Sequence, residues 1–279
     1  MQRCALALVM IALAAGTVAA QPMAGSPTFA TMDRQDGESK VGVALGWTFF
    51  DDDAFGPETD VSAARFDVYG HYVAPSGFGG YGQIALSTIF TDEDDESGVG
   101  NVEGGVVYVI RTGMHDIVLR GGITLPTADD DEGFAANFFA SWPRLTDLAM
   151  AAPETFWLRL SASPILRAGQ FVFRIDGGID FAVSSDGDEP DPLGRLNVGG
   201  GIDTGGVAIL GELITLTSLG DDDDVLDDDE DEDFLHTAAI SARFRAGALE
   251  PGIALGFPLD EDIREGIEFF LIAGLQGRF

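Results

Sequence analysis

Residues 171–183 read FVFRIDGGIDFAV, and this stretch alternates between two kinds of side chain at every step. In a β-strand successive side chains point to opposite faces, so each kind gathers on one face. The apolar face carries Phe171, Phe173, Ile175, Gly177, Ile179, Phe181 and Val183, and the opposite face carries Val172, Arg174, Asp176, Gly178, Asp180 and Ala182. The stretch is longer than the about five or six residues of a typical soluble strand. It fits a tilted strand of about 9–11 residues that crosses a membrane.

The same alternation recurs along the chain from Lys40 onward. Residues 63–72, for example, place Phe66 and Val68 on one face and Arg65 and Asp67 on the other. Over the whole sequence, the pattern predicts twelve strands, at about residues 40–50, 61–73, 79–90, 99–111, 116–125, 155–166, 170–183, 193–203, 207–218, 234–246, 250–257 and 266–279.

The connections between these strands alternate strictly between short and long. The short ones are Ala74–Phe78, Thr112–His115, Arg167–Gly169, Thr204–Gly206 and Gly247–Leu249. The long ones are Asp51–Asp60, Thr91–Gly98, Pro126–Glu154, Ser184–Pro192, Leu219–Asp233 and Pro258–Glu265. Short periplasmic turns and longer outer loops are typical of outer-membrane barrels. The sequence therefore predicts an all-β fold, a transmembrane antiparallel up-and-down β-barrel of twelve strands over residues 40–279.

The residues before the first strand predict an exported chain. Arg3, an apolar run from Ala5 to Ala15 and small residues up to Ala20 predict a signal peptide over residues 1–20. Residues 21–39 contain two prolines and no periodicity, which predicts a flexible periplasmic leader. The single cysteine, Cys4, lies in the predicted signal, so the mature chain has no cysteine for a disulfide or a thiolate metal site.

The formal charge of −32 belongs to the long connections. They hold 35 of the 47 acidic residues and only Arg144 and Arg264 among the bases, which excludes nucleic acid as a partner. The run Asp221–Asp233 has eleven acids in thirteen residues without the spacing of a calcium loop. We expect at most diffuse binding of divalent cations there, and we predict no defined metal site and no cofactor.

The last predicted strand alternates Ile267, Phe269, Leu271, Ala273, Leu275, Gly277 and Phe279, and that phenylalanine is the final residue of the sequence. This closing strand resembles those of the bacterial outer-membrane β-barrel superfamily. The resemblance implies a cell outer-membrane location, with outer-membrane lipid and lipopolysaccharide around the barrel. It also implies that the outer-membrane assembly machinery reads Phe269, Leu271, Leu275 and Phe279. Gly277 stands where this family more often has a larger apolar residue.

A second resemblance concerns two glycine-rich stretches. Residues Gly100–Tyr108 and Gly121–Thr127 resemble uncharacterised outer-membrane transporters linked to aromatic compounds and phenol degradation. This resemblance implies the uptake of a small-molecule solute and assigns no residue a role.

The polar faces of the strands predict a charged interior. The residues expected to line a pore are Arg65, Asp67, Glu103, Arg120, Arg159, Arg174, Asp176, Asp180, Asp203, Arg243, Arg245 and Glu268. Twelve strands enclose more space than the packed interior of an eight-stranded barrel and less than a large porin. Two interpretations remain open: a narrow pore whose charges sort solutes, or a salt-bridged interior that stabilises the barrel.

The connection Pro126–Glu154 differs from the other long connections because its second half is apolar. Phe134, Phe138, Phe139 and Trp142 follow a spacing nearer to helical than alternating, and Pro143 can open a second short helix. We expect the segment either to fold into the barrel mouth, as a gate or a capture site for an apolar substrate, or to cap the rim.

These patterns favour an outer-membrane channel or transporter for the passive or facilitated passage of small solutes. The alternative is a non-transporting structural or adhesive barrel that acts through its acidic loops, and a third interpretation is an enzyme at the rim. We predict no catalytic residues and no enzyme, because His71, His115 and His236 lie on different elements.

Overall fold

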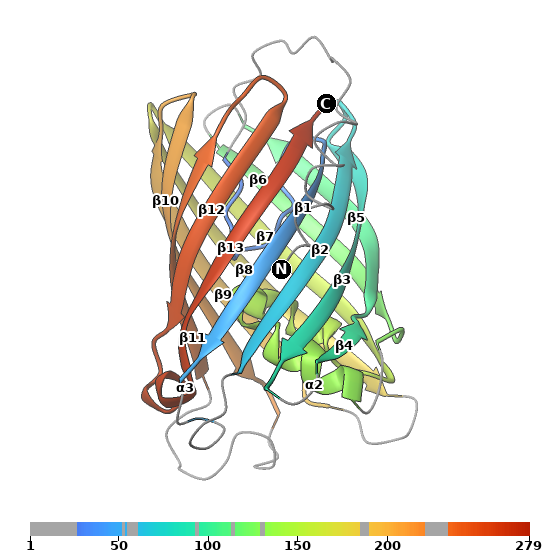
Figure 1. The fold of residues 1–279 in the computed structure, drawn as a ribbon. Helices are drawn as coiled ribbons and strands as arrows, with labels where there is room; N and C mark the ends of the chain where they lie inside the picture. Colours follow the sequence, from blue (N-terminus) through green and yellow to red (C-terminus); the bar gives the residue numbers. More distant parts are fainter. Residues whose placement is uncertain are drawn as a thin grey trace.

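The computed structural model describes residues 27–51, 54, 61–92, 95–112, 115–128, 132–184, 190–220 and 234–279. The predicted signal peptide and the acidic run Asp221–Asp233 lie outside these residues. The described chain forms a closed antiparallel barrel with twelve strand positions (Figure 1). The barrel closes because β1 (Lys40–Phe50) pairs with both β2 (Ser62–Val73) and β13 (Ile267–Arg278).

The predicted all-β, up-and-down barrel is confirmed. The remaining strands are β3 (Phe78–Phe90), β4 (Glu96–Val99), β5 (Val102–Arg111), β6 (His115–Leu125), β7 (Thr155–Ala168), β8 (Phe171–Ser184), β9 (Leu193–Asp203), β10 (Val207–Ser218), β11 (Phe234–Phe244) and β12 (Leu249–Pro258). The strands pair in sequence order, apart from the closure between β13 and β1 and from β4 and β5, which both pair with β3. Such a closed sheet satisfies its backbone groups within the wall, as a structure inside lipid must.

One predicted strand is interrupted. The sequence predicts a single strand over 99–111, whereas β4 and β5 both pair with β3 and are separated by Gly100 and Asn101. The backbone N–H of Asn101 donates to the carbonyl of Met150, at 2.8 Å, rather than continuing the ladder. The strand breaks because Asn101 is used to hold a segment inside the barrel.

The two faces of the strands behave as the alternation predicts. On β8, Phe171 and Phe181 are 65% and 40% exposed, whereas Arg174 and Asp180 are each 1% exposed. The outward face of the barrel is rich in exposed leucine, isoleucine, valine and phenylalanine, which is the apolar belt that a barrel presents to lipid. No helix in the described part of the chain is long and apolar enough to cross a membrane.

The turns at the end of the barrel that carries the C-terminus are tight. Four of them contain a glycine with a positive φ, for example +64° at Gly169 and +66° at Gly247, a conformation that other residues rarely adopt. The opposite end carries the long connections, including α3 (Glu261–Gly266) (Figure 1). The short turns and the long connections therefore lie at opposite ends of the barrel, as the sequence predicts.

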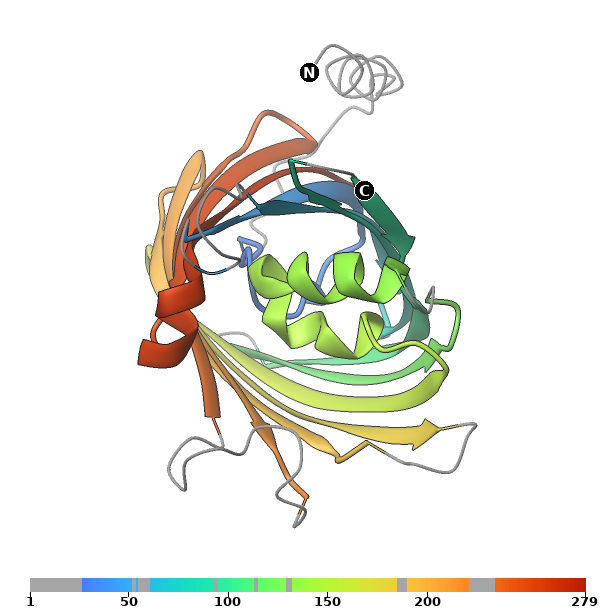
Figure 2. The ribbon, with the colours of Figure 1, turned by 60° about the horizontal axis from the view of Figure 1, so that its bottom comes forward.

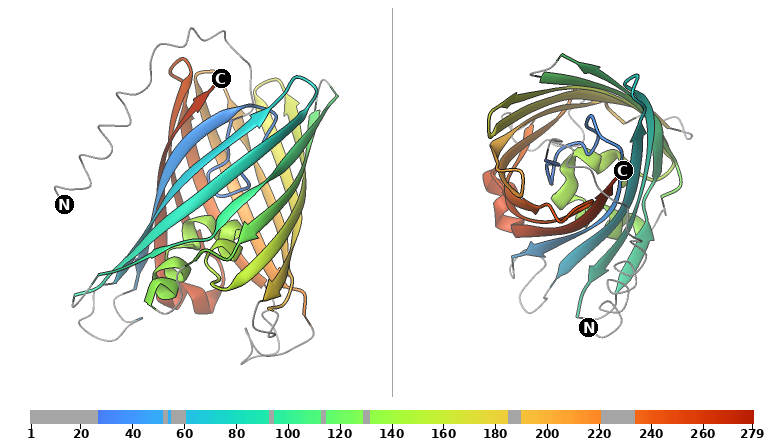
Figure 3. Two further views of the ribbon diagram at one scale, coloured as in Figure 1. Left: turned by 90° about the vertical axis from the view of Figure 1, so that its right-hand side faces the viewer. Right: turned by 90° about the horizontal axis from the view of Figure 1, so that it is seen from above.

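Two segments fill the lumen. The connection after β6 forms α2 (Glu132–Phe139) and a 3₁₀ helix, η1 (Trp142–Met150), and both lie across the barrel (Figure 2). Residues 27–36, which we call the luminal segment, run inside the ring of strands beside η1 (Figure 3). We call residues 126–154 the inward connection.

The sequence assigns residues 27–36 to a flexible periplasmic leader, and in the structure each residue of this luminal segment is buried. Phe29 and Met32 are 1% and 0% exposed, and they lie so close to Gly199 of β9 that a side chain there would clash with both. The segment is held by barrel residues far away in the sequence, and local periodicity carries no sign of such contacts.

Candidate functional site

The luminal segment is held to the wall through its backbone. Glu212 of β10 accepts hydrogen bonds from the N–H groups of Ala30 and Thr31, at 2.8 and 2.7 Å, and from the hydroxyl of Thr31, at 2.7 Å. Ser241 of β11 donates to the same carboxylate, at 2.9 Å. Carboxylate acceptors make hydrogen bonds roughly twice as strong as neutral ones. Glu212 therefore fixes the height of the segment in the lumen.

The inward connection is fastened to both the wall and the luminal segment. The side chain of Asn101 donates to the carbonyl of Ala152, at 2.6 Å, and accepts from the N–H groups of Thr127 and Ala128, both at 2.7 Å. Arg144 of η1 donates to the carbonyls of Ala30 and Met32, at 3.0 and 2.6 Å. The luminal segment and the inward connection thus bind each other as well as the barrel.

Asp147 of η1 is the centre of the charge network. Its carboxylate lies 2.9 Å from a guanidinium nitrogen of Arg144, 3.4 Å from Arg159, 3.6 Å from Arg65 and 3.9 Å from Arg34. These four arginines come from η1, β7, β2 and the luminal segment. One fully buried carboxylate therefore joins η1 to β7, β2 and the luminal segment.

A second centre is Asp33 of the luminal segment. Its carboxylate lies 3.1 Å from Arg120 of β6 and 3.2 Å from Arg195 of β9, and it accepts from the hydroxyl of Ser161 at 3.2 Å. Beside it, Arg34 contacts Asp67 at 2.7 Å and stacks over the ring of Tyr69 at 4.3 Å. Neighbouring residues of one short segment therefore pair with opposite charges of the wall.

The buried charges of the described chain balance. The buried cations are Arg34, Lys40, Arg65, Arg120, Arg144, Arg159, Arg174, Arg195 and Arg243. The buried carboxylates are Asp33, Asp36, Asp67, Glu103, Asp147, Asp176, Asp180, Glu212 and Glu250. The nine buried cations equal the nine buried carboxylates in number, so the formal charge of −32 is carried outside the barrel interior. Pairing is what allows charges to be buried at this density.

Most of the residues predicted to line a pore do face the lumen. Nine of them are at most 6% exposed: Arg65, Asp67, Glu103, Arg120, Arg159, Arg174, Asp176, Asp180 and Arg243. Glu103, Arg159 and Asp180 form one chain of contacts, in which Arg159 meets Glu103 and lies 3.1 Å from Asp180. Asp203 and Arg245 pair with each other at 2.8 Å, close to the turn after β9 and partly exposed. That any of these residues lines a pore stays a prediction.

Glu268 is placed differently from the expectation. The pairing of β1 with β13 slips there, since Phe49 faces Phe269 and Phe50 faces Ile267. The extra residue of this bulge turns Ile267 inward, at 4% exposure, and leaves Glu268 exposed. A one-residue bulge reverses every side chain beyond it.

Six functional candidates were not predicted: Asp33, Arg34, Arg144, Asp147, Arg195 and Glu212. Arg195 and Glu212 share the parity of the inward faces of β9 and β10, so the alternation rule could have found them. The other four lie on segments that the sequence assigns to the leader or to a loop. Their only local sign is opposite charge in neighbouring or nearly neighbouring positions, as in Asp33 and Arg34.

The predicted aromatic residues divide between the interior and the mouth. Trp142 is 7% exposed, and Phe139 packs edge-on against Phe50 with ring centroids 5.6 Å apart. Phe134 and Phe138 are 41% and 37% exposed, with ring centroids 6.0 Å apart. The connection folds into the barrel, as one of the two interpretations expects. Its role as a gate or capture site stays a prediction.

Burial and pairing move the carboxyl pKa values of these segments in opposite directions. Burial alone would raise the pKa of Asp33, but the guanidinium groups of Arg120 and Arg195 hold it well below its ordinary value. The pKa of Asp147 is lowered in the same way, because Arg144 and Arg159 outweigh the burial. Glu38, just after the luminal segment, has its pKa raised to about 7 by burial and by the nearby charge of Asp36.

These shifts predict how closure of the lumen depends on pH. The contribution of Asp33 and Asp147 is present above their unfolded pKa near 3.8 and is lost as pH falls through their lowered folded values. The contribution of Glu38 is fully present below its unfolded pKa near 4.5 and is lost as pH rises through about 7. We therefore expect the lumen to be most tightly closed between the acid range, where Asp33 and Asp147 lose their contribution, and about pH 7, where Glu38 loses its contribution. A pH series should show the lowest ionic conductance in this interval. Glu38→Gln should remove the loss above neutrality and keep the loss in acid, whereas an unchanged alkaline limb would contradict the assignment.

Comparison with known proteins agrees with the architecture. No protein-family model and no curated relative matches the sequence. Among solved structures, the COG4313 outer membrane channel from Pseudomonas putida F1 is similar, with a TM-score of 0.61 at 13% identity, over 91% of this chain and 99% of that chain. The NanC porin matches with a TM-score of 0.52 at 9% identity, over 86% of this chain and 100% of that chain. The KdgM porin in complex with disordered oligogalacturonate matches with a TM-score of 0.51 at 9% identity, over 86% of this chain and 99% of that chain. At these identities the likeness is one of fold: the chain has the closed antiparallel barrel architecture of these outer-membrane channels.

Proposed function

We propose that this protein is an outer-membrane channel for small solutes, closed at rest by its luminal segment and its inward connection. The observation that supports the proposal is the way in which the luminal segment occupies the lumen. Within the described chain it contributes no strand to the sheet, and it is attached by side-chain hydrogen bonds and ion pairs. Such contacts can exchange while the strand ladders of the wall stay intact.

Movement of the luminal segment would expose a charged passage. Arg120 and Arg195 would lose Asp33, and Asp67 would lose Arg34, so these wall residues would face the freed space. The wall itself needs no contact from the segment to close its sheet, because the strands pair with one another all the way around the barrel. The solute we propose is small and polar enough to pass between paired arginines and carboxylates.

The runner-up is a barrel that transports nothing and acts through its outer loops. The dense, balanced and buried network favours it, since an interior closed by many ion pairs is costly to disrupt.

Vesicle swelling distinguishes the channel from the non-transporting barrel. Wild-type protein in phospholipid vesicles should admit small sugars or amino acids faster than protein-free vesicles, and a variant lacking Phe134–Met150 should admit them faster still. Equal rates for all three preparations would support the runner-up.

The proposal includes no enzymatic role. At the outer rim the Nδ1 atom of His236 lies 2.8 Å from Asp260, and the backbone N–H of His236 donates to the other oxygen of the same carboxylate at 2.6 Å. This double contact ties the start of β11 to the connection before α3, which is a structural use of the pair.

The acidic outer connections predict the selectivity of the open channel. Because the buried interior balances, the surplus of acids in the sequence of these connections should set the potential at the outer mouth and concentrate cations. The preference should be strong in dilute salt and fade toward molar salt, where the screening length is about 3 Å. Reversal potentials in a salt gradient, with and without residues 221–233, measure it. Anion preference of the intact protein in dilute salt would show that the arginines of the lumen dominate instead.

A further inference from the structure

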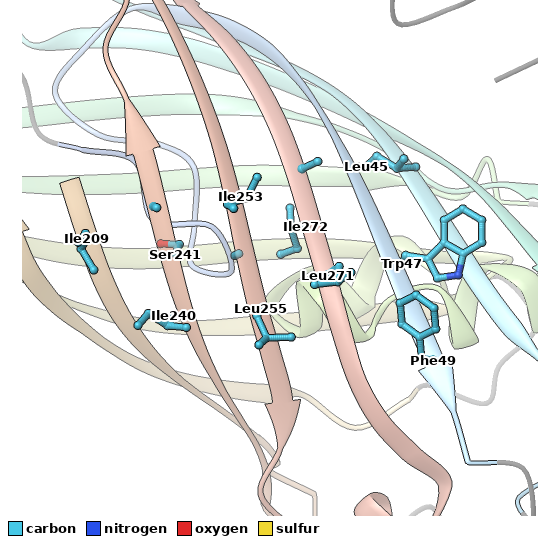
Figure 4. A pocket seen from close by; sticks show the side chains of 13 residues that line it. Leu45, Trp47, Phe49, Ile209, Ile240, Ser241, Ile253, Leu255, Leu271 and Ile272 are labelled. Atoms are coloured by element: carbon cyan, nitrogen blue, oxygen red, sulfur yellow. The ribbon is translucent and has the colours of Figure 1, made fainter. Parts of the chain in front are cut away.

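A groove of about 650 Å³ lies on the outside of the barrel wall, across β1 and β10 to β13 (Figure 4). Its sides carry Trp47 and Phe49 of β1, Ile209 of β10 and Ile240 of β11, and Leu271 lies between them. Among the described residues that line it, Ser241 alone has a hydroxyl or a charge, and that hydroxyl is engaged with Glu212. The volume falls within the about 300–1,000 Å³ of ordinary ligand pockets.

The register of the strands explains the depth of the groove. One outward row runs across the five strands as Ile209, Ala242, Ile253, Ala273 and Leu45, so large and small side chains alternate. The two alanines leave hollows between larger neighbours, and these hollows form the floor. Four steps between adjacent strands span roughly 19 Å, at about 4.8 Å per step. The floor is therefore a channel for a long, thin group rather than a round pocket.

The inner face of the same wall packs against the luminal segment. Ala44, Ala239, Ala254, Phe270 and Ile272 belong to one buried apolar cluster with Ala30 of that segment. The luminal segment therefore packs directly against the back of the groove, with one layer of strand between the two.

The surroundings of the groove identify its occupant. It opens on the apolar belt, so hydrocarbon surrounds it, and an empty apolar hollow loses the contacts that a filled one makes. At the end nearer the long connections, Trp47 stacks on Phe90 with centroids 5.2 Å apart, and Phe49 stacks on Phe269 at 4.5 Å. Aromatic rings gather at the height of lipid headgroups. An amphiphile with its head beside these rings would lay a hydrocarbon chain along Ala273 and Ala242.

We infer that this groove binds one acyl chain of a membrane lipid, held longer than the lipids that surround the rest of the barrel. The long, apolar floor fits a hydrocarbon chain, and the aromatic end fits the boundary between chain and headgroup. The site is independent of the lumen and of any solute that passes through it.

Trp47 provides the test. The other two tryptophans, Trp142 and Trp157, are 7% and 3% exposed inside the barrel. In phosphatidylcholine vesicles with brominated acyl chains, quenching by those chains therefore reports on Trp47. After dilution with excess unbrominated vesicles, the quenching of Trp47 should decay about tenfold more slowly than that of a reporter on plain wall. The plain-wall reporter is the double variant Trp47→Phe, Ala162→Trp, since Ala162 faces outward on β7.

Filling the floor should abolish the slow decay. Ala273→Leu should let the quenching of Trp47 decay as fast as that of the plain-wall reporter, while Ala162→Leu should leave it slow. Leucine is already common on this face, and Ala242→Leu replaces the first variant if that one does not fold. Native mass spectrometry should find one lipid on the wild type and none on the filled variant. Equal decay rates of quenching for Trp47 and the plain-wall reporter would overturn the inference. A dimer mass in native mass spectrometry would also overturn it, because a second copy of the chain would then occupy the groove.

Discussion

Deleting residues 27–36 is expected to turn a closed barrel into a conducting one. The deletion removes Asp33 and Arg34. It also removes the three hydrogen bonds that Glu212 accepts from the N–H groups of Ala30 and Thr31 and from the hydroxyl of Thr31. The wall keeps its complete set of strand pairs, so the barrel should still assemble. Single-channel recordings in planar lipid bilayers should show long, steady openings in the variant and only brief openings in the wild type.

Two controls separate an open pore from a damaged barrel. The deletion variant should keep the heat-modifiable migration of a folded barrel on gels. A synthetic peptide of residues 27–36, added to the side of the short turns, should reduce the conductance again in proportion to its concentration. A folded deletion variant that stays electrically silent would mean that the inward connection alone closes the lumen.

Replacing Asp147 by asparagine is expected to have the largest effect of any single substitution in the lumen. Arg34, Arg65, Arg144 and Arg159 all lie within 4.0 Å of its carboxylate, and their charges would remain in a buried space. Removing one partner of a buried pair costs about 3–5 kcal/mol. Urea unfolding in lipid vesicles should show a loss of this size, and single-channel current should become noisy as η1 loosens.

The matched control is Asp116→Asn on β6. Asp116 lies 3.0 Å from Arg167, whose side chain is 31% exposed, so the pair is open to solvent. Such pairs contribute about 0–1 kcal/mol. An Asp147 variant no less stable than the Asp116 variant would show that the four arginines find other partners, and that Asp147 is not the centre of the network.

The wall of the barrel could be predicted from the sequence because its signals are local. Alternation in residues 171–183 gave the two faces of β8, and the short connections ended where Gly169 and Gly247 adopt positive φ. The two errors in the wall come from a non-local contact and a bulge. Asn101 leaves the ladder to bond Met150, and the slip between Phe49 and Phe50 turns Glu268 outward. Neither event changes the apolar pattern enough to be seen.

Entry of the inward connection into the barrel was one of two interpretations of the sequence, but the contacts that fill the lumen could not be predicted, because the partners are far apart in the chain. Ala30 and Glu212 are separated by 182 residues, and Arg144 and Ala30 by 114. A short segment without periodicity looks the same in sequence whether it moves in water or lies in a barrel. The wall charges did indicate a paired interior, but Arg195 pairs with Asp33 and Arg65 contacts Asp147. Asp33 lies on the predicted leader, and Asp147 lies on a connection that the sequence places only at the mouth or the rim.

The central claim is that the luminal segment must move for solute to pass, and a reversible lock tests it most directly. The hydroxyls of Thr31 and Ser241 lie 2.7 and 2.9 Å from the two oxygens of the Glu212 carboxylate, so Thr31→Cys with Ser241→Cys places one thiol on the luminal segment and one on the wall, on either side of that carboxylate. Cys4, the only cysteine of the sequence, lies in the predicted signal peptide. Vesicle swelling with a small sugar, measured on the oxidised and then the reduced double variant, should give no uptake in the first state and uptake in the second, with each single variant unaffected by oxidation. Equal uptake in the two states would contradict the account.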